Sequence, residues 1–137
     1  MTRTKLAVTM ALAVGIVAGA AVTEVLHAQG DGVKRMMLQK KDLTGIESRE
    51  VVMAAAEIAP GIAAGKHLHH GTEVGYVVEG SAVLEVEGEA PRMLKAGDSY
   101  HVDLRKPHDA KNTGTTPLKV VAVYIVEKGK PLAEPVK

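Results

Sequence analysis

The chain contains no cysteine, no phenylalanine and no tryptophan, and these absences exclude several kinds of site. Without cysteine there is no disulfide framework, no thiolate metal ligand, no cysteine nucleophile and no cysteine for a lipid anchor. The aromatic residues are Tyr76, Tyr100 and Tyr124, which offer few surfaces for stacking bases or sugar rings. The formal net charge of +1 indicates neither a nucleic-acid partner nor an acidic membrane. Stability must therefore come from packing and metal.

The N-terminal residues have the order of a secretory signal peptide. Arg3 and Lys5 precede a mainly apolar run over residues 6–22, and a short polar stretch follows it. We place the cleavage site after Ala28, which predicts a periplasmic or secreted protein with no stable membrane association after cleavage. The alternative is an uncleaved membrane anchor, because the 17 residues of the run fall just short of the roughly 20 that a spanning helix needs.

Cleavage would leave roughly 110 residues, which is room for one compact domain. Residues 33–43 mix basic and apolar side chains and could form an edge strand. The last residues contain prolines and lysines, so we expect a segment that either stays loose or wraps along an edge. The predicted segments are a signal peptide at residues 1–28, an N-terminal arm at 29–48, a folded domain at 49–127 and a C-terminal tail at 128–137.

Short runs of alternating apolar and polar residues begin near residue 50 and continue to residue 126. Residues 83–87 alternate strictly, and Gly80 and Gly88 mark turns on either side. Residues 50–59 contain enough alanine for a short helix, but their valines and the following Pro60 favour a strand. Turn signals every eight to twelve residues or so predict an all-β sandwich or barrel. The other predicted strands span residues 73–79, 92–94, 100–104, 108–111 and 118–126.

Five of the six histidines lie in the segment from His67 to His108. His67 and His69 are two residues apart, so their side chains point to the same face of an extended backbone. Glu73 follows four residues after His69, and two imidazoles with one carboxylate form a facial arrangement that leaves metal positions open. His108 would supply a fourth ligand from a later strand. The pattern predicts one divalent transition-metal ion per chain, with iron, manganese, nickel, copper and zinc all compatible.

Two segments resemble the sequence motifs of the cupin superfamily. Residues 61–80 read GIAAGKHLHHGTEVGYVVEG and resemble the first motif, and residues 97–112 read GDSYHVDLRKPHDAKN and resemble the second. The resemblance implies a double-stranded β-helix, the cupin jelly-roll barrel, with the metal at its mouth. The matching positions are Gly61, His67, His69, Glu73 and Gly80 in the first motif and Gly97, His108 and Asn112 in the second. The ligands that the resemblance implies are His67, His69, Glu73 and His108.

The second motif departs from the family pattern just before its histidine. Asp103 and Arg105 stand where relatives usually carry Pro-x-Gly. Because a glycine at this place relieves a positive φ, Arg105 predicts a changed turn and a shifted His108. Asp103 could accept a hydrogen bond from a ligand imidazole, or it could lie in a solvated loop.

Four other polar residues near the motifs have more than one interpretation. Tyr76 and Tyr100 could line the pocket with their hydroxyls or serve as core packing. His101 could be a pocket residue or an ordinary exposed one. Tyr76 and His101 are the candidate catalytic residues, as proton carriers. His70 is expected to face outward, because its neighbours face the metal.

Two classes of function are open. The first is a metal-dependent enzyme of the dioxygenase, isomerase or decarboxylase type, and the second is a non-catalytic module that binds a small molecule or the metal itself. Pocket walls of valine, leucine, methionine and alanine favour a compact, partly apolar ligand. We expect a homodimer, in which residues 33–43 pair through an edge strand.

Overall fold

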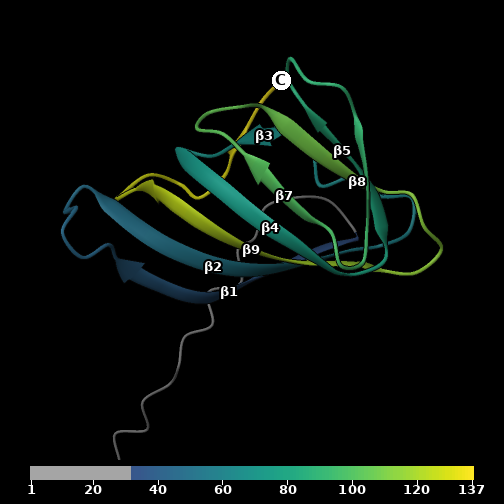
Figure 1. Cartoon of the computed structure of the whole chain (residues 1–137), viewed down its shortest axis with the longest axis horizontal. Helices are drawn as coiled ribbons and strands as arrows, with labels where there is room; N and C mark the ends of the chain where they lie inside the picture. Colours follow the sequence, from purple (N-terminus) through teal and green to yellow (C-terminus); the bar gives the residue numbers. More distant parts are fainter. Residues whose placement is uncertain (1–31) are drawn as a thin grey trace, which may run out of the picture.

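The computed structural model of the chain describes residues 32–137, so the predicted signal peptide lies outside the described residues (Figure 1). Residues 32–137 form ten β-strands and no helix, and therefore no helix long and apolar enough to span a membrane. The strands are β1 (Val33–Asp42), β2 (Arg49–Ile58), β3 (His67–Leu68), β4 (Gly71–Glu79), β5 (Ser81–Val86), β6 (Arg92–Lys95), β7 (Ser99–Val102), β8 (His108–Asn112), β9 (Leu118–Glu127) and β10 (Glu134–Pro135).

The strands build two five-stranded sheets that face each other. The first sheet has the order β1-β2-β9-β4-β7 and the second the order β10-β3-β8-β5-β6, with antiparallel pairing between neighbours. In Figure 1 the long strands of the first sheet curve beneath the shorter strands of the second. The predicted all-β double-stranded β-helix is confirmed.

The alternation of residues along β4 decides which side chains enter the barrel. Glu73 and Val77 are buried on the inner face, whereas Val74 and Tyr76 are half exposed on the outer face. Gly75 also lies on the inner face, where a Cβ atom would come within 2.1 Å of the Tyr100 ring. The glycine therefore lets Tyr100 cross the strand toward Glu73.

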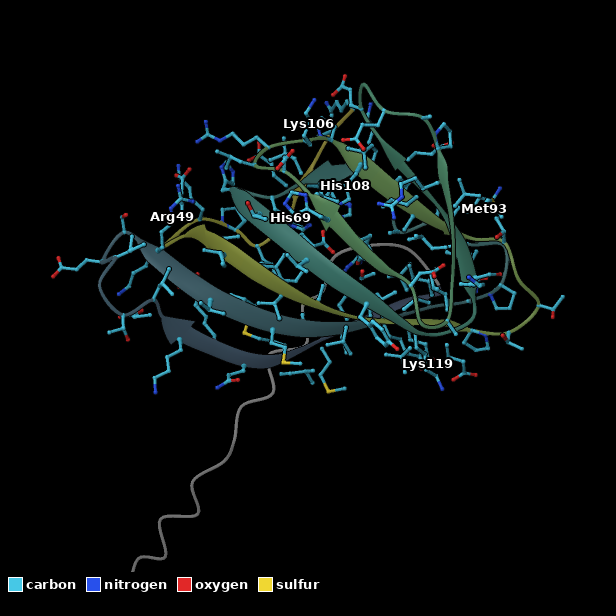
Figure 2. The ribbon with its side chains drawn as sticks, in the orientation of Figure 1. Arg49, His69, Met93, Lys106, His108 and Lys119 are labelled. Carbon is cyan, nitrogen blue, oxygen red and sulfur yellow. The ribbon has the colours of Figure 1, made fainter. Side chains whose placement is uncertain are left out.

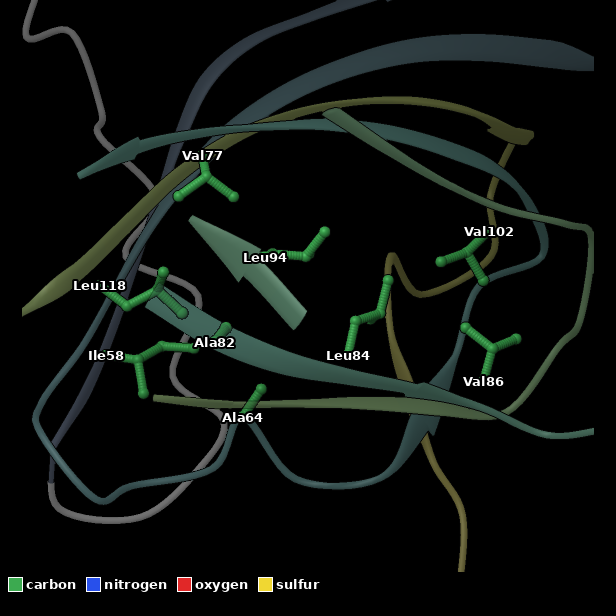
Figure 3. Packing of buried hydrophobic residues seen from close by; sticks show 9 residues of the cluster. All are labelled: Ile58, Ala64, Val77, Ala82, Leu84, Val86, Leu94, Val102 and Leu118. Atoms are coloured by element: carbon green, nitrogen blue, oxygen red, sulfur yellow. The ribbon is translucent and has the colours of Figure 1, made fainter. Parts of the chain in front are cut away.

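The apolar core lies between the two sheets (Figure 3). Val77 and Leu118 are completely buried, and they come from neighbouring strands of the first sheet. Leu84 and Leu94 reach them from the second sheet and are almost completely buried. The cluster consists of Ile58, Ala64, Val77, Ala82, Leu84, Val86, Leu94, Val102 and Leu118.

Asn112 is a polar residue at the end of the barrel that contains the apolar core, and its exposed fraction is 0%. Its side-chain Nδ2 atom donates to the carbonyl oxygens of Ile58 at 2.9 Å and Thr116 at 2.8 Å. Its Oδ1 atom accepts a hydrogen bond from the Gly114 backbone N–H at 2.9 Å. The asparagine of the second motif thus joins segments that are far apart in the sequence.

The two terminal segments of the described chain both add strands to the barrel edges. β1 pairs with β2 from Val33 opposite Ile58 to Asp42 opposite Glu50, so the arm forms an edge strand as predicted. The C-terminal segment wraps along an edge, the second of its two predicted forms: β10 pairs with β3, placing Pro135 opposite His67. β7 ends at Val102 rather than at residue 104, because the next residues turn toward β8.

Candidate metal centre

Three imidazole rings meet inside the barrel. His67 is on β3, His69 follows that strand, and His108 is on β8 directly opposite His67. The three side chains are buried, and one ring nitrogen of each lies within 4.8 Å of the others. Figure 2 shows His69 and His108 inside the barrel, whereas Met93 and Lys119 lie on its outside. This cluster could hold a metal ion.

Each of the three rings is oriented by a backbone carbonyl group. The contacts are His67 Nδ1 to Gly65 O at 2.6 Å, His69 Nδ1 to Leu132 O at 2.5 Å, and His108 Nδ1 to Lys106 O at 2.9 Å. A carbonyl oxygen can only accept, so each Nδ1 carries the proton and donates it. In a neutral ring this leaves the lone pair on Nε2, which is the atom that would bind a metal.

Glu73 lies against the imidazoles with one carboxylate oxygen and against two tyrosines with the other. Its Oε2 atom is 3.0 Å from His69 Nε2 and 3.2 Å from His108 Nε2. Its Oε1 atom accepts hydrogen bonds from the hydroxyls of Tyr100 at 2.8 Å and Tyr124 at 3.3 Å. The tyrosines thus orient the carboxylate so that Oε2 faces the rings.

Burial and the contacts of Glu73 set the protonation states of the site. Burial would raise the pKa of Glu73, but the hydrogen bonds and charges of His108 and His69 outweigh burial and hold the pKa well below its usual range. Burial of the ring lowers the pKa of His67 to about 4. Burial and the Glu73 charge raise the pKa values of Tyr100 and Tyr124 well above 10. Burial opposes the charge of His108, but its hydrogen bond to Glu73 and the Glu73 charge outweigh burial and raise the pKa of His108, so a metal ion bound at its Nε2 atom would displace a proton. Near neutral pH the metal-free site therefore contains a carboxylate, a neutral His67 imidazole and protonated tyrosines.

The turn before His108 corrects one expectation. We expected Arg105 to change the turn, but Arg105 itself adopts the left-handed conformation that glycine favours, with φ of 58°. Its backbone N–H donates to His69 O at 3.0 Å, and its guanidinium contacts Glu127 at 3.0 Å. The turn therefore keeps its positive φ, and His108 takes its place beside His67.

The other candidates from the sequence lie outside the cluster. Tyr76 is 51% exposed on the outer face of β4, on the opposite side from Glu73. His101 is also exposed, and its Nε2 atom is 3.5 Å from the exposed Asp103 carboxylate. Asp103 therefore contacts a surface histidine and not a ligand ring. His70 lies outside the cluster, but the C-terminal segment covers it through a 2.7 Å contact with Glu134.

A cavity of about 210 Å³ opens beside the cluster. Its walls come from β1, β2, β9 and the C-terminal segment, and Arg35 is the one charged residue other than histidine among those that line it. Sequence reasoning missed Arg35 and Tyr124, because only the register of the sheet brings them here: Arg35 lies opposite Ala56, and Tyr124 lies opposite Glu73. The lining residues are Arg35, Ala54, Ala55, Ala56, His67, His69, Val120, Ala122, Tyr124, Pro131, Leu132 and Ala133.

Known proteins resemble this chain over the same region. Residues 54–124, slightly more than half of the chain, match the cupin domain family. The oxalate-binding protein of Thermotoga maritima is 35% identical over 77 residues, covering 55% of this chain and 62% of that protein. The HTH-type transcriptional regulator PuuR of Escherichia coli is 30% identical over 81 residues, covering 58% of this chain and 43% of the regulator. This chain thus spans less than two thirds of the length of either relative.

Solved structures share the fold. The crystal structure of an RmlC-like cupin from Shewanella frigidimarina superposes with a TM-score of 0.59 and 26% sequence identity. The superposition covers 80% of this chain and 89% of that one. The similarity therefore extends over nearly the whole of the Shewanella chain and includes both sheets described above.

Proposed function

Because the chain belongs to the cupin domain family, we propose that it binds one divalent transition-metal ion through His67, His69 and His108. Glu73 is the fourth ligand, since its Oε2 atom already faces two of the rings. The bound ion supplies open coordination positions for an oxygen or nitrogen atom of a small molecule. Three imidazoles and one carboxylate suit iron, manganese, nickel, copper and zinc alike.

The orientation of the three rings is the observation that supports this proposal. In each ring a backbone carbonyl accepts from Nδ1, which turns the basic Nε2 atom away from the backbone. The Nε2 atoms of His69 and His108 lie 3.0 Å and 3.2 Å from Glu73 Oε2. The ring nitrogens and the carboxylate oxygen therefore converge on one place inside the barrel, as the ligands of a single metal ion do. The donor set therefore fits the ion.

The cavity favours binding of a small molecule over catalysis by protein side chains. The two tyrosine hydroxyls already donate to Glu73, and their raised pKa values keep them protonated. The candidate proton carriers Tyr76 and His101 lie on the outside of the barrel. The relative from Thermotoga maritima is named an oxalate-binding protein, which also supports a binding role. We therefore propose a metal-dependent small-molecule binder.

Zinc titration of the metal-free chain tests the metal site. We expect one ion per chain for the wild type, and an affinity weakened by more than about 100-fold in His69→Ala, because even partners outside the ligand set contribute 10–100-fold. His101→Ala is the matched control, since it removes an exposed histidine on β7 of the same barrel. Isothermal calorimetry and metal analysis measure both quantities. Equal zinc affinity in the two variants would contradict the proposed site.

Turnover separates the binder from the enzyme alternative. Metal-loaded protein is incubated with small carbonyl, enol and carboxylate compounds, with and without oxygen, and products are followed by mass spectrometry. A binder leaves each compound unchanged. Substrate-dependent turnover that disappears in His69→Ala and persists in His101→Ala would instead support a dioxygenase, isomerase or decarboxylase.

The outer face of the first sheet supports a homodimer. Val74 on β4 lies opposite Val123 on β9, and both are exposed, as are the nearby Tyr76 and Ile125. A contiguous apolar surface of this kind is typical of a contact between subunits. We propose that a second copy of the chain covers it, which places the dimer contact on β4 and β9 and not along residues 33–43, where it was expected from the sequence. A monomeric mass in solution at about 100 µM protein, a concentration far above the dissociation constants of stable dimers, would contradict the dimer.

A further inference from the structure

The cavity beside the histidines carries a positive charge that comes from the N-terminal arm. Arg35 lies on β1 opposite Ala56 of β2, so both residues face the interior. The arm is therefore part of the cavity wall. Arg35 lines the cavity together with His67, His69 and Tyr124.

The guanidinium of Arg35 is held in place by the protein. Its Nη2 atom donates to the carbonyl oxygen of Ala64 at 3.1 Å. Burial lowers the pKa of Arg35, while the neighbouring acidic groups of Tyr124, Glu73 and Asp109 act in the opposite direction. An arginine stays protonated under these conditions, because its reference pKa is so high. The cavity therefore contains a fixed cation of planar, forked geometry.

The charges of the filled site determine what kind of ligand fits. Neutral imidazoles contribute no charge, Glu73 contributes one negative charge, and a divalent ion with Arg35 contributes three positive charges. The walls beside these charges are mostly alanine, valine, leucine and proline. An anion in the cavity would be attracted both by the ion and by the guanidinium of Arg35, and apolar walls strengthen this attraction.

We propose that the cavity takes a small carboxylate, with its carboxylate group bound by Arg35 and a second oxygen atom facing the three histidines. This inference rests on the proposed metal site and names the ligand class for it. Arg35 matches a carboxylate because two parallel N–H groups of a guanidinium fit its two oxygens. Arg35 is thus the residue that selects an anion over a neutral compound of the same shape.

The walls limit the size and polarity of this carboxylate. Ala54, Ala56 and Ala122 offer methyl groups and no hydrogen bonds, and the Tyr124 hydroxyl donates to Glu73. A ligand with several hydroxyl groups would leave them unpaired in the cavity. Short carboxylic acids with a carbonyl or a small alkyl group satisfy both limits.

Calorimetry with two probes of the same shape tests the role of Arg35. Zinc-loaded protein is titrated with pyruvate, and with pyruvamide as its neutral analogue. We expect pyruvate to bind at least about 30-fold more weakly to Arg35→Gln than to the wild type, since losing one partner of a buried charged pair has an effect of this size or more. Pyruvamide should bind weakly and equally to both. Arg92→Gln, which changes an exposed arginine on β6, is the matched control and should bind pyruvate like the wild type.

Further measurements separate the possible failures. Arg35→Lys keeps the charge and loses the fork, so its pyruvate affinity should lie between those of the wild type and Arg35→Gln. Equal affinity of the wild type for the two probes, or pyruvate binding unaffected by Arg35→Gln, would overturn the inference. If the wild type binds no zinc, the proposed metal site fails by itself. The same two probes applied to the metal-free chain then support Arg35 if pyruvate binding depends on it and overturn its role if not.

Discussion

Along single strands, the inward-facing side chains of the barrel change from polar at one end to apolar at the other. On β4 the inward side chains are Glu73 near one end and Val77 near the other, about 13 Å apart at the rise of a strand. On β9 they are Tyr124 and Leu118. We call the region around His67, His69, Glu73, His108, Tyr100 and Tyr124 the site half of the interior. We call the region around Ile58, Val77, Ala82, Leu94 and Leu118 the apolar half.

The two halves contribute to stability with opposite signs. The apolar half removes hydrophobic side chains from water, which stabilises the fold. The site half keeps a carboxylate and three imidazoles out of water, which costs free energy unless every polar atom has a partner. The pKa of about 4 for His67 reflects this cost, because burial opposes its charged form. The apolar half should therefore provide most of the stability of the metal-free chain. The site half should gain stability when a metal ion or another ligand binds.

Asn112 is the largest exception to this division, because it is a polar residue at the apolar end. Asn112→Ala would leave the carbonyl oxygens of Ile58 and Thr116 and the N–H of Gly114 without their side-chain partner. At 1–3 kcal/mol for each buried group, we expect a loss of about 4 kcal/mol in the free energy of unfolding. Urea denaturation of the metal-free chain measures it. A loss below about 1 kcal/mol would mean that water replaces these bonds and that Asn112 is not structural.

Leu118→Ala tests the apolar half itself. Leu118 has an exposed fraction of 0%, so the substitution opens a cavity and should lower the free energy of unfolding by about 3 kcal/mol. Zinc stoichiometry should stay at one ion per chain, because Leu118 lies at the far end of β9 from Tyr124. Met93→Ala is the control, since Met93 is 71% exposed and its removal should change stability by less than about 0.5 kcal/mol. Loss of zinc binding without loss of stability would contradict the division.

The C-terminal segment should affect the site half and leave the apolar half unchanged. The carbonyl of Leu132 orients His69, while Glu134 contacts His70 and the Val136 N–H donates to Lys66 O. Ending the chain after Lys130 removes these contacts, and zinc affinity should fall about 10-fold to 100-fold. Glu134→Ala keeps the Leu132 carbonyl and should lose less. Unchanged zinc affinity in the shortened chain would show that His69 needs no support from this segment.

Local patterns were sufficient to predict most strands and the histidines of the site. Strict alternation over residues 83–87 predicts β5 and its inward face, because the side-chain period of a strand is two. Residues 50–59 could have been a helix by alanine content, but nearly all of them lie in β2, which pairs with β1 along one edge and with β9 along the other. The three histidines that meet in the barrel are those of the two motifs.

Long-range register explains what the sequence could not predict. Arg35 and Tyr124 reach the cavity only because β1 pairs with β2 and β9 with β4 in one particular register. A shift by one residue would turn each of them outward, and no local pattern excludes that shift. The Leu132 carbonyl has no sequence signal at all, since every residue has a carbonyl group. Tyr76 and His101 were misleading for the related reason that both point to the outside.

Substitutions of Arg105 should change the free energy of unfolding less than the substitutions in the barrel interior. They test directly the turn that positions His108. With φ of 58°, a residue with a Cβ atom is strained by roughly 1 kcal/mol relative to glycine. The ion pair with Glu127 is largely exposed, so it offsets little of this strain. Arg105→Gly should therefore be more stable than Arg105→Ala by about 1 kcal/mol in urea denaturation, and within about 1 kcal/mol of the wild type.

A β-branched residue at the same position extends the test. Arg105→Val should be less stable than Arg105→Ala, because a branched Cβ is more strained at positive φ. If strain in this turn also displaces His108, zinc affinity should follow the order Gly, Ala, Val, and the Arg105 N–H to His69 O contact couples the turn to both rings. Equal stability of the three variants would mean that the turn relaxes to negative φ in solution. In that case His108 would owe its position to its pairing with His67 and Val86 alone.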